Sequence, residues 1–397
     1  MSAVIINKNL SKIASPIIIF GELLGTSLWF SINSVANDLM SAWDINLASI
    51  GYLTIAVQFG FVLGTLLFAL GGIADKFRPS QLFSVCAALG ALFNGLFVFY
   101  AENIYVGSAF RFTVGICLAG IYPIGMKLII TWDPQKASQR IAQLVGMLTL
   151  GTALPHATRY FGVDWTWQSV ILASSASAIL ASLMILILGD GPHIKLDHQS
   201  RTSFKGITNF FKISKYKNSA FGYFGHMWEL YAFWALVPIL ISQTHNITNP
   251  IELSGWSFLV IAIGSIGCLI GGQMSSIIGN VKVASYALLI SALCCLVFPW
   301  MQKVPLYIQI VFWMVWGMSV IADSPHFSTL SAQACPAEKI GAALTIQNSV
   351  GFLITMISIQ ISTALVENLN AYISWLLLPG PILGYTLLNR TQSKQIK

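Results

Sequence analysis

The chain has 397 residues, of which 56% are hydrophobic and only 9% are charged, and its mean hydropathy is +0.74. Soluble domains carry about 25% charged residues, so this composition excludes an ordinary soluble protein and indicates an integral membrane protein.

Apolar runs of about 18 to 25 residues recur from end to end, and each can cross a hydrocarbon core of about 30 Å as a helix. We predict an all-α, multi-pass protein of the inner (plasma) membrane with twelve transmembrane helices. The expected spans are 16–37, 49–72, 81–101, 106–130, 139–160, 167–188, 218–241, 253–276, 282–300, 306–328, 341–365 and 371–388.

The basic residues gather in loops that an even number of crossings places on one side of the membrane. These loops include Lys76, Arg78, Lys136 and Arg140, together with the polar stretch 190–217. The loops on the opposite side are mainly acidic. Their acidic residues are Asp38, Asp44, Glu102, Asp164, Glu252 and Glu367. This positive-inside pattern predicts cytoplasmic termini and accounts for the net charge of +7 without a nucleic-acid partner.

The longest polar interruption, 190–217, divides the predicted spans into six and six. Residues about 200 positions apart match between the halves, as expected for an internal repeat. Gly60 and Gly115 correspond to Gly264 and Gly317, and Glu22 corresponds to Glu229; Pro123 likewise matches Pro325. We therefore predict a six-helix bundle at 1–189, a cytoplasmic linker at 190–217 and a second six-helix bundle at 218–397. Such repeats are typical of transporters whose substrate site lies near midplane between the halves.

Two motifs carry a family resemblance. The loop "GGIADKFRPS" resembles the conserved cytoplasmic loop of the major facilitator superfamily, and "RFTVGICLAG" resembles that superfamily's Arg-x-x-x-Gly motif through Arg111. The chain is identified as a member of this superfamily, of the bacterial 12-span type, with its substrate branch left open. The resemblance implies alternating access, with a cytoplasmic gate formed by the matching loop residues; a solvated turn is the alternative. The expected gate residues are Gly71, Asp75, Lys76 and Arg78.

The resemblance also bears on Arg111 and on the direction of transport. It implies that Arg111 takes part in proton relay and substrate anchoring, whereas the plainer alternative is that its side chain reaches the outer interface. The fifth span, "GMLTLGTALPH", lacks the Gly-Pro pair of the superfamily's antiporter motif. This departure makes export by antiport less favoured than uptake.

Charged and polar residues inside spans need a reason, because an ionisable side chain at the centre of a spanning helix costs about 2.5 to 3.5 kcal/mol. In the first span, Glu22, Thr26, Trp29 and Asn33 share one face of a continuous helix, so we expect that face to line the substrate cavity. Glu22 is a candidate second proton site or a ligand for a cationic group. The alternative for Glu22 is a packing role in which a neighbouring Ser or Tyr bonds it.

The seventh span contains "FGHMWELYAFW", in which His226 and Glu229 are three residues apart and can meet on one helical face. Burial favours the protonated form of a carboxylate and a nearby cation favours the ionised form, so a carboxylate balanced between them can load and release a proton. We predict that Glu229 carries the coupling proton with His226 as its partner. The alternative is a Glu–His contact that only locks two helices together.

For most of the other polar residues in the spans, the sequence is consistent with two roles. Gln347 and Asn348 are candidates for binding substrate, although bonds between helices are equally expected. His156 and Arg159 either attract anions near the outer mouth or cap a helix end. Asp323, just before Pro325, either faces the cavity or bonds backbone groups freed by the proline. Lys127 is expected to anchor the inner interface.

These features predict a proton-coupled uptake transporter for a small polar organic solute, with a carboxylate or a carboxylate-type metal chelate favoured. The alternatives are a proton-driven exporter of amphiphilic cations and, from another class, a non-transporting membrane sensor or scaffold. We expect a monomer in contact with membrane lipid, with H+ as coupling ion and no cofactor or bound metal. Because the sequence has no P-loop, GxSxG, HExxH or cysteine cluster, we do not expect an enzyme.

Overall fold

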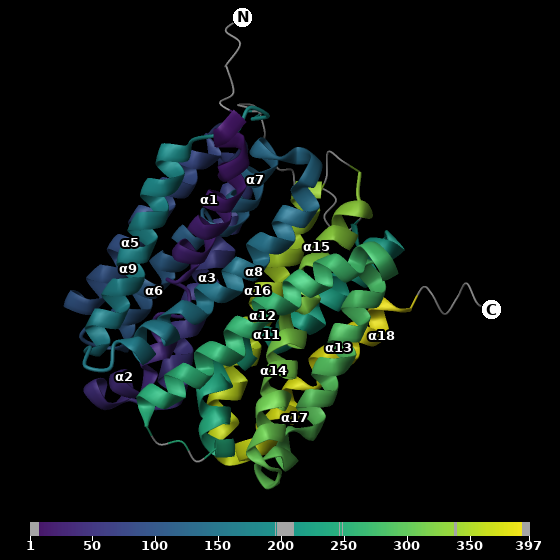
Figure 1. Ribbon diagram of the computed structural model, residues 1–397. Helices are drawn as coiled ribbons and strands as arrows, with labels where there is room; N and C mark the ends of the chain where they lie inside the picture. Colours follow the sequence, from purple (N-terminus) through teal and green to yellow (C-terminus); the bar gives the residue numbers. More distant parts are fainter. Residues whose placement is uncertain are drawn as a thin grey trace, which may run out of the picture.

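The computed structural model describes residues 8–194, 196, 210–245, 247, 249–336 and 340–390, and every regular element among them is helical. Half of the expected linker at 190–217, residues 195 and 197–209, lies outside these ranges. The helices form two groups that lie side by side: the purple-to-teal helices of the first half and the green-to-yellow helices of the second (Figure 1).

The first half contains nine α-helices and two short 3-10 helices among the described residues. They are α1 (Lys8–Thr26), η1 (Asn33–Val35), α2 (Ala36–Trp43), α3 (Leu47–Gly71), α4 (Ile73–Lys76), α5 (Pro79–Tyr100), α6 (Ile104–Leu118), α7 (Tyr122–Trp132), η2 (Pro134–Lys136), α8 (Ala137–Phe161) and α9 (Trp167–Leu188).

The second half repeats this pattern of long helices broken by short turns. Its elements are α11 (Ser214–His245), α12 (Pro250–Ile278), α13 (Asn280–Val297), η3 (Phe298–Lys303), α14 (Leu306–Ala322), α15 (Ser324–Gln333), α16 (Ile340–Leu369), η5 (Asn370–Tyr372), α17 (Ile373–Leu377) and α18 (Pro379–Leu388).

Local sequence explains where several long helices begin. The side chain of Asn103 accepts hydrogen bonds from the backbone N–H groups of Tyr105 and Val106, and Asn46 and Thr166 cap α3 and α9 in the same way. Such side chains supply acceptors for N–H groups that have no partner within the helix. Asparagine and threonine therefore set the starts of α3, α6 and α9 at one end of the molecule.

Each predicted span overlaps a long or interrupted helix. Nine segments of the described chain are long and apolar enough to cross a membrane, and the last of them, Gly341–Leu388, contains α16 to α18. The prediction of a multi-pass, all-helical protein is confirmed. The count of twelve crossings and the cytoplasmic placement of the termini stay predictions.

Four of the predicted spans are interrupted. The first ends as α1 at Thr26 and continues through turns at 27–32 into η1, the fourth breaks between α6 and α7, the tenth breaks at Asp323 between α14 and α15, and the twelfth breaks at Leu378 between α17 and α18. Pro123 and Pro325 lie at the starts of α7 and α15. Since proline cannot donate to the preceding turn, these two repeat-related residues account for two of the breaks.

The glycines that match between the halves make the same helix crossing in each half. A Cβ on Gly60 would lie 1.9 Å from the backbone oxygen of Phe112, and one on Gly115 would lie 2.1 Å from that of Val57, so α3 and α6 touch backbone to backbone. In the second half, α12 and α14 cross in the same way at Gly264 and Gly317. Small residues permit such close approach between helices in membranes.

Two helix pairs join the halves: α3 packs on α16, and α8 packs on α12. We call the end with Asp44, Glu102 and Asp164 the acidic end, and the end with Lys76 and Lys136 the basic end. The helices between the two ends place a cavity and an aromatic cluster in the space between the halves.

Candidate functional site

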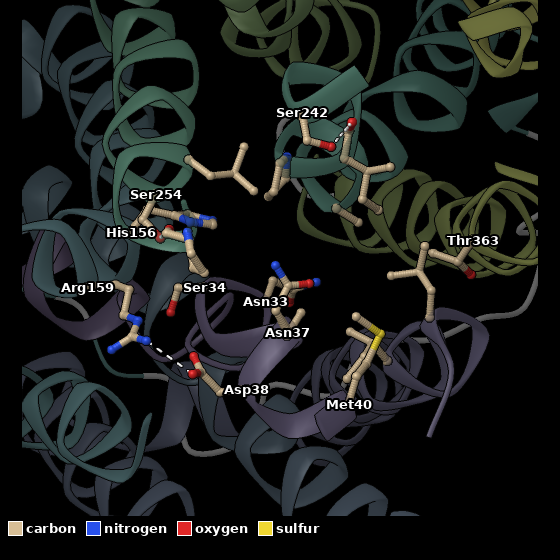
Figure 2. A pocket seen from close by; sticks show the side chains of 18 of the residues that line it. Asn33, Ser34, Asn37, Asp38, Met40, His156, Arg159, Ser242, Ser254 and Thr363 are labelled. Atoms are coloured by element: carbon tan, nitrogen blue, oxygen red, sulfur yellow. Dashed lines mark hydrogen bonds and ion pairs between the residues drawn. The ribbon is translucent and has the colours of Figure 1, made fainter. Parts of the chain in front are cut away.

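A cavity of about 360 Å³ lies between the two halves toward the acidic end. Its wall combines η1, α2, α3 and α8 of the first half with α11, α12 and α16 of the second. Figure 2 shows polar side chains around this space from both halves. Those used below are Asn33, Thr54, His156, Arg159, Ser254 and Thr363.

His156 is the most unusual group in the wall. Its side chain is 1% exposed, and neither imidazole nitrogen has a hydrogen-bond partner. Buried polar groups in folded proteins nearly always have a partner, and an unmet one costs about 1 to 3 kcal/mol. An unpartnered imidazole in the wall of a cavity is therefore a candidate binding group.

Arg159, one helical turn beyond His156, already has partners at the cavity rim. Its Nη2 donates to Asp38 Oδ1 over 3.1 Å, and its Nη1 donates to the backbone oxygen of Trp165 over 2.7 Å. Figure 2 shows the link to Asp38 as a dashed line. Arg159 therefore joins α2 to α8 near the end of α8. This arrangement agrees better with the prediction of a helix cap than with that of a group free to attract anions.

Of the four residues predicted to share one face of the first span, Asn33 is the one that lines the cavity. Its Nδ2 donates to Thr54 Oγ1 over 3.0 Å, which joins η1 to α3 within the wall. This bond fixes the amide beside the space between the halves.

Six aromatic residues pack between the halves on the basic-end side of the cavity, and we call them the aromatic floor. Their rings are all buried and touch across the halves: Trp29 stacks on Phe352 with centroids 5.6 Å apart, and Phe30 meets Trp234 edge-on at 5.9 Å. The aromatic floor therefore fills the path between the bundles below the cavity. Its members are Trp29, Phe30, Phe61, Tyr231, Trp234 and Phe352.

The prediction that one continuous helical face of the first span lines the cavity is wrong. That face requires a continuous helix, but α1 ends at Thr26, whose hydroxyl donates to the backbone oxygen of Glu22. Beyond this point the chain turns, so Trp29 enters the aromatic floor while Asn33 reaches the wall. Trp29 is held there by a hydrogen bond from its Nε1 to Gln58 Oε1 at 3.2 Å.

Glu22 lies deeper in the first half and does not line this cavity. It is fully buried, neither carboxylate oxygen has a hydrogen-bond partner, and Oε2 lies against Gly125, where a Cβ would approach it to 2.4 Å. The alternative prediction, in which a neighbouring Ser or Tyr forms a hydrogen bond with Glu22, is therefore wrong.

The predicted contact between His226 and Glu229 is wrong. Nδ1 of His226 lies 2.8 Å from Oδ1 of Asp323, whereas Oε1 of Glu229 accepts hydrogen bonds inside the second half from Ser291, Cys295 and Trp316. Three positions along a helix leave two side chains about 60° apart around the axis, enough for each to meet a different neighbour. Glu229 therefore joins α11 to α13 and α14.

Arg111 joins helices within the first half, as Glu229 does within the second. It is 1% exposed and therefore does not reach the outer interface. Its guanidinium donates to Asn94 Oδ1 on α5, to Ser31 and to the backbone oxygens of Leu28 and Trp29. These two oxygens belong to the turn where α1 is interrupted, so Arg111 satisfies backbone groups that the break leaves without helical partners.

Of the two polar residues predicted in the eleventh span, Gln347 bonds between helices. Its Oε1 accepts from Ser331 on α15, and the Ser331 hydroxyl also lies 2.9 Å from Ser219 on α11. Asn348 is partly buried on α16. Neither belongs to the wall of the cavity at the acidic end.

The loop that resembles the superfamily motif is organised by a residue that we expected only to anchor the interface. Lys127 Nζ on α7 lies 2.6 Å from Asp75 Oδ1 and also donates to the backbone of Ala74. Lys76 donates to the backbone oxygen of Gly71 over 2.7 Å. Lys127 therefore joins α7 to the loop within the first half, and the proposed gate, Arg78 included, stays a prediction.

Sequence reasoning did not select Thr54, Ser254 or Thr363 for the wall. Hydroxyls in the middle of a helix commonly bond the backbone four residues earlier, which hides any other role. Ser254 and Thr363 do bond the backbone oxygens of Pro250 and Ile359. Only the fold brings them beside the same cavity.

Two helical bundles with repeat-related crossings and a polar cavity between them define a multi-pass transporter of small solutes. The chain belongs to the Major Facilitator Superfamily, whose family model matches residues 18–359. Members of this superfamily are transporters and not enzymes, in agreement with the sequence prediction.

One similar protein is the niacin transporter NiaP of Acinetobacter baylyi, which is 26% identical over 153 residues. That alignment covers 38% of this chain and 34% of NiaP, so the match spans about a third of the relative.

Solved structures of transporters have the same fold. The proton:xylose symporter XylE matches with a TM-score of 0.75 at 11% identity, covering 98% of this chain and 96% of that one. The nucleoside transporter NupG matches with a TM-score of 0.70 at 13% identity, covering 96% and 99%. A bacterial homologue of the human lysosomal transporter Spinster, inward-facing and occupied, matches at 0.69 and 15% identity, covering 98% of each chain.

Proposed function

We propose that the protein is a secondary transporter that takes up a small organic carboxylate together with protons, as a monomer in the plasma membrane. The observation that carries this proposal is His156, whose buried and unpartnered imidazole lies in the wall of a cavity between the halves. A solute in this cavity would contact both bundles, as alternating access requires.

The size of the cavity suits a small solute. Sites for small molecules commonly have volumes of about 300 to 1,000 Å³, and this one, at about 360 Å³, is at the lower limit. A compact acid with one ring or a short chain fits that range better than an oligosaccharide or a peptide.

The chemistry of the wall favours a solute that accepts hydrogen bonds. The N–H of the His156 imidazole and the amide of Asn33 can both donate, and a carboxylate accepts through two oxygens. Arg159 and Asp38 neutralise each other at the rim, so a bound anion would be held by hydrogen bonds from His156 and Asn33. The similarity to a niacin transporter supports this solute class, because niacin is a carboxylic acid on a small ring.

Proton coupling is supported by ionisable side chains buried in both halves. Glu22 is a suitable proton carrier in the first half, because neither carboxylate oxygen is engaged by another group. Glu229 is less suitable, since three donors from α13 and α14 already bind one of its oxygens.

A second candidate function is the export of amphiphilic cations in exchange for protons. The unpartnered carboxylate of Glu22 favours it, since a buried acid in the same half as the aromatic residues Trp29 and Phe61 suits a lipophilic amine. The two functions differ in the charge of the solute that binds.

A thermal-shift screen of the purified protein separates them. A ligand that binds only the folded state stabilises it by about 2.7 kcal/mol at a hundredfold excess over Kd. We expect nicotinate or benzoate to raise the unfolding temperature of the wild type but not of His156→Phe, which fills the same site without a donor. Stabilisation by lipophilic amines alone would replace the uptake proposal with the exporter.

A further inference from the structure

The pair His226–Asp323 differs from every other ion pair in the described part of the chain. Both side chains are at most 2% exposed, whereas each of the other three pairs has both partners at least 11% exposed. Asp323 also occupies the break between α14 and α15. The contact therefore fastens α11 to a point where the helical backbone is already interrupted.

The pair is flanked by two aromatic rings, and two of its polar atoms, Nε2 of His226 and Oδ1 of Asp323, have no well-directed hydrogen bond. The His226 ring lies 5.9 Å from the Tyr223 ring and 5.8 Å from the Phe327 ring, and its Nε2 has no hydrogen-bond partner. An imidazolium facing a carboxylate carries no net charge. Loss of one proton leaves a carboxylate in surroundings that stabilise an isolated charge poorly.

The other ionisable groups near the pair come from three helices. Two further helices, α16 and α18, also pack against α11. Glu367 lies near the C-terminal end of α16, and Tyr385 lies in α18. The neighbouring groups are Glu229 and Tyr223 on α11, Cys268 on α12 and His326 on α15. None of these four neighbours is a lysine or arginine, although Lys136 lies in the wall of the second cavity described below. When protonated, His226 supplies the positive charge in contact with Asp323.

A second cavity, of about 760 Å³, reaches toward the pair from the basic end. It lies between α8 of the first half and α12 and α15 of the second, and its wall includes Pro325 and His326, two and three residues after Asp323. Water in this cavity would stand close to the break that holds Asp323. The cavity at the acidic end lies on the far side of the aromatic floor.

One helix connects the pair to the solute cavity. After His226, α11 contributes Tyr231 and Trp234 to the aromatic floor and then Ala235 to the cavity wall. A change in the contact between His226 and Asp323 would therefore act on the helix that carries both the floor and the wall.

We propose that His226 and Asp323 together bind one of the transported protons, at a site separate from the solute cavity, and that release of this proton opens the second cavity at the basic end. The proposal rests on the proposed function. The proton passes from the imidazole of His226 to water in the second cavity, so that the imidazole becomes neutral and the carboxylate of Asp323 stays ionised. Water entering from the second cavity then solvates that carboxylate, and α8 and α12 separate at the basic end.

The test measures the distance between α8 and α12 at the basic end as a function of pH, with no solute present. Spin labels are attached at Gln139→Cys and Ser276→Cys, two exposed positions on opposite sides of the second cavity, in a Cys335→Ser background. The other five cysteines are buried. Pulsed electron–electron double resonance on the protein in liposomes gives the populations of short and long distances between the two spin labels.

We expect the ratio of long to short distances in the otherwise wild-type protein to rise by about tenfold between pH about 5 and about 8, where histidine changes charge. Asp323→Asn and His226→Gln should each give a ratio that no longer depends on pH. Glu252→Gln is the control, because this exposed acid lies in the first turn of α12, far from the basic end, and the variant should respond as the wild type does.

Two results would overturn the proposal: a wild-type ratio that does not change with pH, or a pH response retained in folded Asp323→Asn or His226→Gln. The wild-type measurement decides even if a variant fails to fold. Because no solute is used, failure here leaves the carboxylate proposal intact, whereas a negative thermal-shift screen would count against the solute and leave this pH response unaffected.

Discussion

Nη2 of Arg111 donates a hydrogen bond to the backbone oxygen of Trp29 over 2.7 Å. This contact ties α6 to the turn that interrupts the first span, and the side chain of Trp29 in turn stacks on Phe352 of the other half. A buried cation within one bundle thus holds an aromatic residue at the interface between the bundles.

Replacing Arg111 should lower the free energy of unfolding. Arg111→Gln removes the charge and leaves several acceptors of the broken helix without a donor, which we expect to cost about 3 kcal/mol. The matched control is Arg140→Gln, because Arg140 forms a partly exposed pair with Asp133, and its loss should cost less than about 1 kcal/mol. Denaturant unfolding in detergent measures both, and equal losses would refute the role of Arg111.

Glu229 should matter for stability through its acceptor oxygen and not through its charge. Glu229→Ala leaves Ser291, Cys295 and Trp316 without their acceptor and should cost about 2 to 4 kcal/mol, because buried donors lose a partner and a cavity forms. Glu229→Gln retains an acceptor oxygen and should cost much less. If Gln and Ala destabilise the protein equally, the carboxylate charge itself is required.

The backbone contact between α3 and α6 predicts that Gly60 tolerates no side chain. In Gly60→Ala the new methyl group would overlap the backbone oxygen of Phe112, and overpacking of this kind costs about 1 to 3 kcal/mol. Gly341→Ala is the control, since nothing lies within 4 Å of its Cβ position. The two unfolding temperatures should differ clearly, and a Gly60 variant as stable as the Gly341 variant would contradict the close crossing.

Much of the fold could be predicted from the sequence because a membrane imposes a simple rule on it. Apolar length indicates a helix, so the predicted spans overlap the helices, and glycines such as Gly115 and Gly317 mark equivalent crossings. The breaks could not be placed in the same way. The end of α1 at Thr26 depends on Arg111, which is distant in sequence, and helical periodicity assumes an unbroken helix.

The site could be predicted less well because partners in a bundle come from distant helices. Spacing within one helix brought His226 and Glu229 together, but it carries no information on Asp323, about 100 residues away, whose carboxylate meets the imidazole. His156 was considered only for the outer mouth. That its imidazole has no hydrogen-bond partner, and that residues of the second half complete the cavity around it, follows only from the folded structure.

Solute uptake into liposomes tests most directly the central claim that the cavity around His156 binds a carboxylate for transport. Radiolabelled nicotinate would be supplied outside vesicles with an acidic exterior, containing either the wild type or His156→Phe. We predict accumulation with the wild type that collapses when the pH gradient is dissipated, and at most about a tenth of that rate with His156→Phe, the loss expected for a missing contact of about 1.4 kcal/mol. Equal accumulation by folded His156→Phe would contradict the account.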